Sequence, residues 1–283
     1  MLDIIVRPEG ELAMGSDRRA RIEFKPGGSA ANQAAWLAHF GARPSFIGRV
    51  GAGDHAEQSA LLRAAGVAPH LIADAHWATG RLIALIEASG ERSFYTDRGA
   101  NEALEIADIA PELIDKADAL HLSGYSYFAK KPREAVLAAM AQAAPKPTSI
   151  DPASAEFLRA YGGAKFLAET RGAQVCLPNR DEAAVLSGVG DAPSQADFLA
   201  RHYQTVVIKL GAEGCIAASG ERRWRLGGLP TPIVDATGAG DAFAGAFLAA
   251  RFAGEPMQAS LTRAVAAGAV AAGQVGGRPP TRA

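Results

Sequence analysis

The sequence predicts an α/β fold, in which a doubly wound, mostly parallel sheet carries a small additional β-sheet. From residue 103 onward, short apolar runs alternate with stretches of helical composition, which is typical of a parallel sheet covered by helices on both faces. The first hundred residues hold shorter, partly alternating runs broken by proline, glycine or charged residues, as in strands exposed on one face. Since no linker in the 283 residues separates independent units, we expect a single domain over 1–283.

Strands and helices follow each other regularly in the larger part of the chain. Apolar runs predict strands within 117–124, 147–153, 173–179 and 205–214, and a shorter one at 232–234. Helices are predicted over Pro132–Ala144, Ala155–Ala168 and Arg180–Ser187, then after Asp241 and over 256–274.

The beginning of the chain predicts the small sheet. Four short runs place it in two separated segments, about 4–26 and 76–100. Between these segments, a helix over Ser29–Phe40, a strand at 45–50 and a helix over Asp54–Ala65 belong to the main fold. We expect the small sheet to act as a lid and to offer a surface for a homodimer.

Composition excludes several classes of function. A formal net charge of −1 gives no reason to expect binding to nucleic acid or to a membrane. Cys176 and Cys215 lie in apolar runs, which is typical of reduced, buried thiols in a cytoplasmic protein. The six histidines lack metal-binding spacing, so we expect no transition-metal site. We find no signal peptide and no membrane span, and expect an unexported protein.

The run DATGAGD at residues 235–241 predicts an anion site. Gly238, Ala239 and Gly240 form a turn of small residues that opens directly into a helix. Such a turn points backbone N–H groups at a ligand and suits phosphate. Asp241, in the first helical turn, either interacts only with the helix dipole or accepts a proton from a substrate hydroxyl.

A second glycine turn precedes the first predicted helix. Gly27 and Gly28 allow a backbone to approach a ligand closely, and Asn32 offers a donor and an acceptor to vicinal hydroxyls. The alternative is a plain strand-to-helix turn with Asn32 on a solvated face.

Taken together, GGSAAN at 27–32 and DATGAGD at 235–241 resemble the two signatures of the ribokinase-like PfkB family of carbohydrate and nucleoside kinases. DPAS at 151–154, NRDE at 179–182 and IKLGAEG at 208–214 match further family segments in the same order. The resemblance covers essentially the whole chain. It implies a ribokinase-like fold and an ATP-dependent sugar kinase, which transfers the γ-phosphoryl group to a hydroxyl of a small sugar or sugar acid.

The resemblance also implies roles for individual residues. Asp241 is expected to be the catalytic base, beside an anion hole formed by the backbone of Gly238, Ala239 and Gly240. The other implied ligands are, for ATP and Mg²⁺, Asn179, Glu182, Lys209, Gly211 and Gly214; for the acceptor, Asp3, Gly27, Gly28 and Asn32; and for a monovalent cation such as K⁺, Asp235 and Thr237. Ala236 replaces a second family threonine, which leaves the cation site open.

Three other functions compete with the sugar kinase. Residues 51–56, followed about twenty positions later by Asp74, fit the dinucleotide-binding fingerprint of an NAD-dependent oxidoreductase. This interpretation gives no role to GGSAAN at 27–32 or to DATGAGD at 235–241. A non-catalytic sensor on the same fold would usually lack the base, and Asp241 is present. Nucleoside kinases of the same family stay possible because Tyr125, Tyr127 and Phe128 offer rings for a base to stack on.

The acceptor sugar stays open. Family ribokinases commonly carry a lysine where this chain has Ser29 and a glutamate where it has Ser123, which weakens ribose as the acceptor. The segment at 90–98 looks more like fructokinases or 2-keto-3-deoxygluconate kinases.

The first residues lead to one more expectation. MLDIIV aligns with a family segment whose aspartate holds sugar hydroxyls, which makes Asp3 the candidate ligand and puts Met1 at a position usually occupied by asparagine. The strand that precedes this segment in the family is missing. We therefore expect the natural protein to start roughly ten residues upstream, about one strand and a turn.

Overall fold

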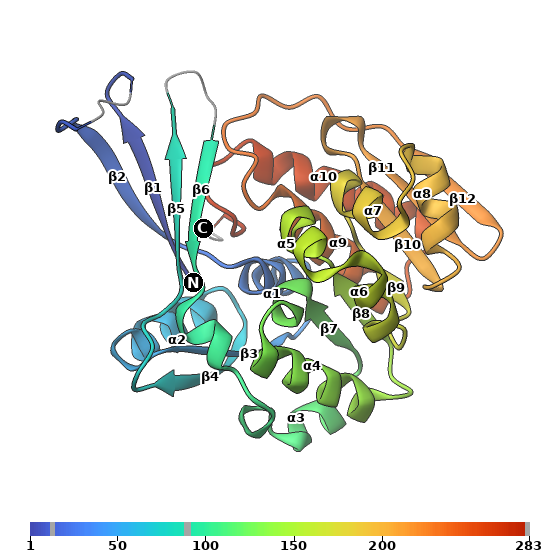
Figure 1. Ribbon diagram of the computed structural model, residues 1–283. Coiled ribbons are helices and arrows are strands. Elements are labelled where there is room, and N and C mark those ends of the chain that lie inside the picture. The colour runs from blue at the N-terminus through green and yellow to red at the C-terminus, as the bar shows by residue number, and fades with distance from the viewer. Residues whose placement is uncertain (12–14, 88–91, 281–283) are drawn as a thin grey trace.

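A central sheet forms the body of the molecule (Figure 1). The computed structural model describes residues 1–11, 15–87 and 92–280, and within them this sheet has six strands in the order β12-β11-β10-β9-β8-β7. Strands β7 to β10 are parallel, whereas β11 and β12 continue the sheet antiparallel. Their bounds are Leu120–Ser123 (β7), Thr148–Asp151 (β8), Val175–Cys176 (β9), Thr205–Lys209 (β10), Cys215–Ser219 (β11) and Arg222–Leu226 (β12).

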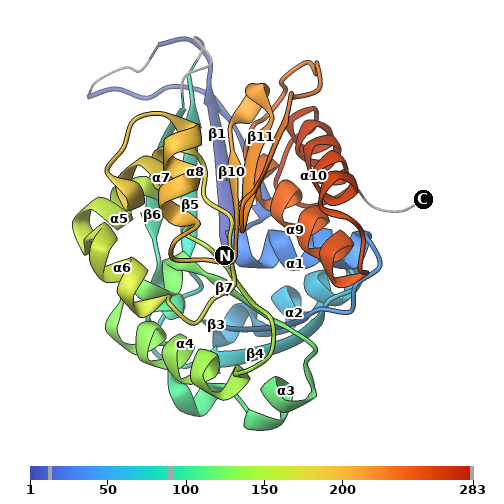
Figure 2. The ribbon, with the colours of Figure 1, turned by 90° about the vertical axis from the view of Figure 1, so that its right-hand side faces the viewer.

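Helices cover both faces of this sheet (Figure 2). Along β10, alternate side chains divide between two cores: Val206 and Ile208 pack against α5 to α8, and Val207 packs against α9 and α10. The first face carries α4 (Lys130–Ala143), α5 (Ala155–Tyr161), α6 (Gly163–Glu169), α7 (Arg180–Ser187) and α8 (Ala192–Leu199). The second carries α1 (Ser29–His39), α9 (Ala239–Phe252) and α10 (Met257–Ala272).

A separate four-stranded sheet stands beside the body, in the order β2-β1-β5-β6. Strand β1 (Leu2–Pro8) pairs antiparallel with β2 (Ala20–Pro26) and parallel with β5 (Arg81–Ile86), and β6 (Arg92–Asp97) pairs antiparallel with β5. These strands lie within residues 2–26 and 81–97, and of the two expected segments, 4–26 and 76–100, the parts at 12–14 and 88–91 lie outside the described residues. We call this the N-terminal sheet.

The remaining elements are a separate strand pair, the helix between its strands and several short helices. Strands β3 (Ser45–Gly51) and β4 (Ala68–Asp74) form a parallel pair of their own, joined through η1 (Ala52–Asp54) and α2 (His55–Ala64). The other short helices are η2 (Gly99–Ala103), η3 (Ile106–Asp108), α3 (Pro111–Lys116), η4 (Gly124–Tyr127) and η5 (Gly211–Glu213).

Two predicted elements are wrong in detail. The single helix over 155–168 is two helices, because Gly162 adopts a φ of +98° between α5 and α6. The predicted strand at 232–234 is a loop: the N–H of Val234 donates to the carbonyl of Ala272 at the end of α10, so it joins no strand. Helix α8 was not predicted.

Helix α1 packs closely against α9 and fixes the position of the site. A Cβ on Gly245 would lie 2.6 Å from Cβ of Trp36, so a glycine is needed where the two helices touch. Cys176 and Cys215 are buried free thiols, as predicted. Among the described residues, no helix combines the length and apolar character needed to cross a membrane.

Candidate active site

The N-terminus of α9 lies at the centre of the site. Gly238 precedes the helix with a φ of +80°, and a Cβ there would lie 2.3 Å from Cα of Gly277. The preceding loop is held by Asp235, whose carboxylate accepts from the N–H of Thr237 (2.9 Å) and from that of Gly276 (3.3 Å). Because N–H groups in the first turn of a helix lack partners within the helix, this turn can bind an anion.

Asp241 accepts hydrogen bonds from three side chains of α1. Ser29 Oγ donates to Oδ1 (2.6 Å), Asn32 Nδ2 to Oδ2 (3.0 Å) and Gln33 Nε2 to Oδ1 (3.1 Å). Positions i, i+3 and i+4 share one face of a helix, which is why one turn of α1 supplies all three donors. Burial raises the pKa of Asp241 to about 6, the charge of Asp151 adds to this rise, and the three hydrogen bonds oppose it.

A buried ion pair lies beside Asp241. Lys209, at the end of β10, places Nζ 2.6 Å from Oδ2 of Asp151, at the end of β8, and Gln33 Nε2 donates to the same oxygen at 3.2 Å. Burial alone would lower the pKa of Lys209, but the charges of Asp151 and Glu182 outweigh it and the pKa is raised. Lys209 is therefore a buried, charged lysine, not a solvated strand end.

Asn179 and Glu182 meet at the start of α7. The Asn179 side chain accepts from the N–H of Glu182 (2.8 Å), and the Glu182 carboxylate accepts from the N–H (2.8 Å) and Nδ2 (2.7 Å) of Asn179. Asn179 also forms a parallel bridge to Lys209, which brings three predicted ATP-side residues together. Burial raises the pKa of Glu182 to about 7, and the charge of Lys209 opposes this.

The glycines of the turn after β10 differ in their surroundings. A Cβ on Gly214 would lie 2.1 Å from the carbonyl oxygen of Leu226, so this glycine is needed for packing. A Cβ on Gly211 would meet nothing within 4 Å, although its φ of +60° favours glycine. The position above Gly211 is therefore open.

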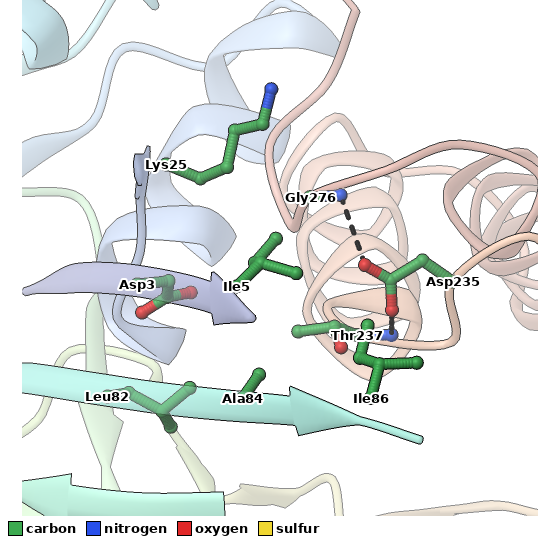
Figure 3. Close-up of a pocket in the computed structure, with 9 residues that line it drawn as sticks. All are labelled: Asp3, Ile5, Lys25, Leu82, Ala84, Ile86, Asp235, Thr237 and Gly276. Atoms are coloured by element: carbon green, nitrogen blue, oxygen red, sulfur yellow. Dashed lines mark hydrogen bonds between the residues drawn. The ribbon is translucent and has the colours of Figure 1, made fainter. Parts of the chain in front are cut away.

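The predicted acceptor ligands also come together. A Cβ on Gly27 would lie 1.9 Å from Oδ1 of Asp3, so the backbone before α1 rests against this carboxylate. Asp3 and the two candidate cation ligands Asp235 and Thr237 line one pocket between the N-terminal sheet and the loop before α9 (Figure 3). Burial raises the pKa of Asp3 to about 6, whereas nearby positive charge, including Arg278, lowers it.

Asn32 has an unused acceptor. Its Nδ2 donates to Asp241, and among the described residues its buried Oδ1 accepts no hydrogen bond. A buried acceptor without a donor is costly.

Sequence analysis did not assign Gln33 and His121 to the site. Gln33 is fully buried and contacts Asp241, Asp151 and His121. The spacing of Ser29, Asn32 and Gln33 on one helical face was the available signal, but the partners from other elements lie between 88 and 212 positions away in the chain.

Local structure accounts for the residues of the rival dinucleotide motif. Asp74 Oδ1 accepts from the N–H groups of His76 and Trp77, both at 2.8 Å, and Oδ2 lies 2.9 Å from Nε of Arg49. The backbone hydrogen bonds contribute most to lowering the pKa of Asp74. The N–H of Gly51 donates to Oγ1 of Thr79. Both residues therefore have structural roles that require no cofactor.

The family model of the pfkB family carbohydrate kinases matches residues 1–283. The chain belongs to this family. An ATP-dependent ribose-1-phosphate kinase of Halopiger xanaduensis is 30% identical over 98% of this chain and 88% of its own length. A 2-dehydro-3-deoxygluconokinase of Thermoproteus tenax is 31% identical over 90% of this chain and 81% of its own length.

Solved structures of other kinases share the fold. A provisionally named ribokinase II of E. coli, solved with ATP and Mg²⁺, has a TM-score of 0.87 at 23% identity, covering 99% of this chain and 93% of its own. The adenosine kinase of Sinorhizobium meliloti has a TM-score of 0.86 at 24% identity, covering 99% of this chain and 93% of its own. The predicted ribokinase-like fold and the predicted ATP-dependent carbohydrate kinase are confirmed.

Proposed function

We propose that this kinase transfers the γ-phosphoryl group of ATP to a hydroxyl of a small sugar or sugar acid, with Asp241 as the catalytic base. The observation that carries the proposal is the position of Asp241 in the first turn of α9, next to the Gly238–Gly240 turn. A hydroxyl against Asp241 loses its proton to the carboxylate. N–H groups of the turn stabilise the negative charge on the transferred phosphoryl group.

The hydrogen bonds around Asp241 suit this role. With a pKa of about 6 the carboxylate is mostly ionised at neutral pH, yet basic enough to accept a proton. Ser29, Asn32 and Gln33 hold both oxygens, and the free Oδ1 of Asn32 can accept from the same substrate hydroxyl or its neighbour. Asp3, against Gly27, would receive another hydroxyl.

ATP would approach from the ends of β9 and β10. Lys209 supplies positive charge, Gly211 leaves open space, and Glu182 with Asn179 lies at the start of α7. No group of three or more His, Cys, Asp or Glu side chains suited to a metal occurs among the described residues. This donor set fits Mg²⁺, which commonly binds through substrate phosphates and one or two carboxylates, here Glu182. When bound, Mg²⁺ neutralises charge on the phosphates.

Two guanidinium groups favour an acceptor that carries a negative charge. Arg98 stacks over the Tyr125 ring at 4.5 Å, and Nε of Arg278 is buried without a hydrogen-bond partner among the described residues. Burial is the largest cause lowering the pKa of each guanidinium, and Asp3 opposes this at Arg278. The relative named as a ribose-1-phosphate kinase points the same way. A sugar acid or sugar phosphate is therefore favoured over a neutral sugar.

The outer face of the N-terminal sheet supports the proposed homodimer. Ile22, Phe24, Ile83 and Tyr95 expose between 40% and 64% of their surface, and the strand register places Phe24 and Tyr95 on the same face as Ile4 and Ile83. A continuous apolar face of this kind favours association with a second copy. The opposite face lines the pocket of Asp3, as a lid would.

A nucleoside acceptor is the alternative. The positions of the three aromatic side chains favour it less than sequence analysis suggested. Tyr127 is fully buried and packs on Phe166, and Phe128 stacks between Phe157 and Phe166. Of the three proposed rings, only that of Tyr125 remains as a candidate for stacking on a base, and the Arg98 guanidinium already lies over it. Potassium activation through Asp235 and Thr237, and a cytoplasmic location, also stay proposals.

One screen tests the proposed function. ADP release is measured with ribose, fructose, ribose 1-phosphate, 2-keto-3-deoxygluconate and adenosine as acceptors, with and without K⁺. We expect the anionic acceptors to give the highest kcat/KM. A preference for adenosine would establish the nucleoside alternative, and release without any acceptor dependence would contradict the kinase proposal.

A further inference from the structure

A chain of hydrogen bonds runs from β7 through α1 to Asp241. His121, on β7, places Nδ1 2.8 Å from Oγ of Ser149 and Nε2 2.5 Å from Oε1 of Gln33. The other end of the Gln33 amide, Nε2, lies 3.1 Å from Oδ1 of Asp241 and 3.2 Å from Oδ2 of Asp151. One buried amide therefore joins a histidine to two carboxylates that lie on different elements of the fold.

The partners of this amide allow one orientation only. Two ionised carboxylates can accept but not donate, so the NH₂ group of Gln33 must face Asp241 and Asp151. Its carbonyl oxygen then faces His121, which has to carry a proton on Nε2. Burial lowers the pKa of His121 to about 4, so the ring is neutral at pH 7, and its Nδ1 accepts from the Ser149 hydroxyl.

We propose that Gln33, held in this orientation by His121, is a positioning residue whose side-chain NH₂ group donates to the carboxylates of both Asp241 and Asp151 and thereby keeps Asp241 ionised and fixed. The inference rests on the proposed function, in which Asp241 is the base. Asp151 and Asp241 are like charges whose repulsion favours protonation of Asp241. The two N–H groups of Gln33 donate to both and reduce that repulsion.

The charged and titratable groups around Asp241 come from several elements. Asp151 on β8 raises its pKa, and Lys209 on β10 and Tyr125 on η4 interact with its charge. Glu182 on α7 acts on the Lys209–Asp151 pair. All of these groups remain in a Gln33 variant, so a change in the pKa of Asp241 there reports the loss of the amide.

The test measures that pKa directly. Carboxyl-¹³C-labelled aspartate is introduced into the full chain, the Asp241 signal is assigned by its loss in Asp241→Asn, and its chemical shift is followed from pH 4 to pH 9. Because a hydrogen bond to an ionised group is among the stronger ones, Gln33→Met should raise the pKa of Asp241 by about one unit. The titration needs neither nucleotide nor acceptor, so it gives an answer even if the proposed function fails.

Gln195 provides a matched control. It is another fully buried glutamine, on α8, and its Nε2 donates to the carbonyls of Val189 and Gly190. Gln195→Met should lower Tm as Gln33→Met does, yet leave the pKa of Asp241 unchanged. An equal shift in both variants would show a general effect of destabilisation and would overturn the proposal, as would no shift in Gln33→Met.

His121 gives a second, independent test. His121→Phe removes the donor to the Gln33 carbonyl, so the amide is held less firmly against Asp241 and the pKa of Asp241 should rise by about half a unit, less than with Gln33→Met. In the Gln33→Met background the same change should add nothing, since His121 acts through Gln33. Equal shifts in both backgrounds would mean that His121 acts on its own. If Gln33→Met does not fold, no shift in His121→Phe alone overturns the proposal.

Discussion

Ser29 Oγ lies 2.6 Å from Oδ1 of Asp241, although 212 positions separate the two residues in the chain. The first turn of α1 thus contacts the first turn of α9 directly through these side chains. In family ribokinases, this position commonly carries a lysine. With a serine here, Asp241 receives a neutral hydrogen-bond donor at this position.

Replacing Asp241 by Asn removes the proton acceptor while it keeps the shape of the side chain. Turnover should fall by at least the ~10²-fold that is typical of a lost general base, because the substrate hydroxyl keeps its proton. ATP binding, measured by calorimetry, should survive because the turn before α9 is unchanged. Turnover close to that of the original chain would rule out Asp241 as the base.

The pH dependence of catalysis should follow the Asp241 carboxylate. Its pKa is raised to about 6, and only the ionised form accepts a proton, so kcat/KM should fall as the pH is lowered through about 6. Initial rates between pH 4.5 and pH 8 measure this limb. If kcat/KM instead falls only near pH 4, where an ordinary aspartate titrates, another group limits the reaction.

Asn32→Ala should affect the acceptor and spare the nucleotide. The variant loses the donor to Asp241 Oδ2 and the free Oδ1, and a lost hydrogen bond to a bound hydroxyl costs about 1–3 kcal/mol. The acceptor KM should rise about tenfold or more while the ATP KM hardly moves. If only the ATP KM rises, the first glycine turn serves the nucleotide.

Gly27→Ala tests the contact between the N-terminal sheet and α1. The new methyl group would lie 1.9 Å from Asp3 Oδ1, so the carboxylate must move and acceptor affinity should drop with a lower Tm. Gly190→Ala is the control, because a Cβ there meets nothing within 4 Å. Equal acceptor affinity in the two variants would remove Asp3 from the acceptor site.

Phe24→Lys tests the proposed dimer. Phe24 exposes 64% of its surface on the outer face of the N-terminal sheet, and a charge there should oppose burial against a second copy. Sedimentation velocity should show a dimer for the original chain and a monomer for the variant. A monomeric original chain would contradict the dimer.

Sequence reasoning predicted both glycine turns of the candidate site because their small-residue patterns are local. Gly28 and Gly238 both adopt positive φ at the start of a helix, a role that small-residue patterns reveal. It missed the roles of Gln33 and His121 because their partners come from other elements, and only the packing of α1 against α9 and β7 brings them together. Similarly, the apolar run at 232–234 suggested a strand, but its backbone bonds to the end of α10.

The contact between α1 and α9 also sets when activity can appear during protein synthesis. Ser29, Asn32 and Gln33 are translated at least 208 positions before Asp241. At the usual rates of elongation, the ribosome needs on the order of 10 to 40 s to cover that length. A nascent or truncated chain that lacks α9 therefore lacks the proposed base, and we expect phosphoryl transfer only once both ends of the fold have been made and have docked.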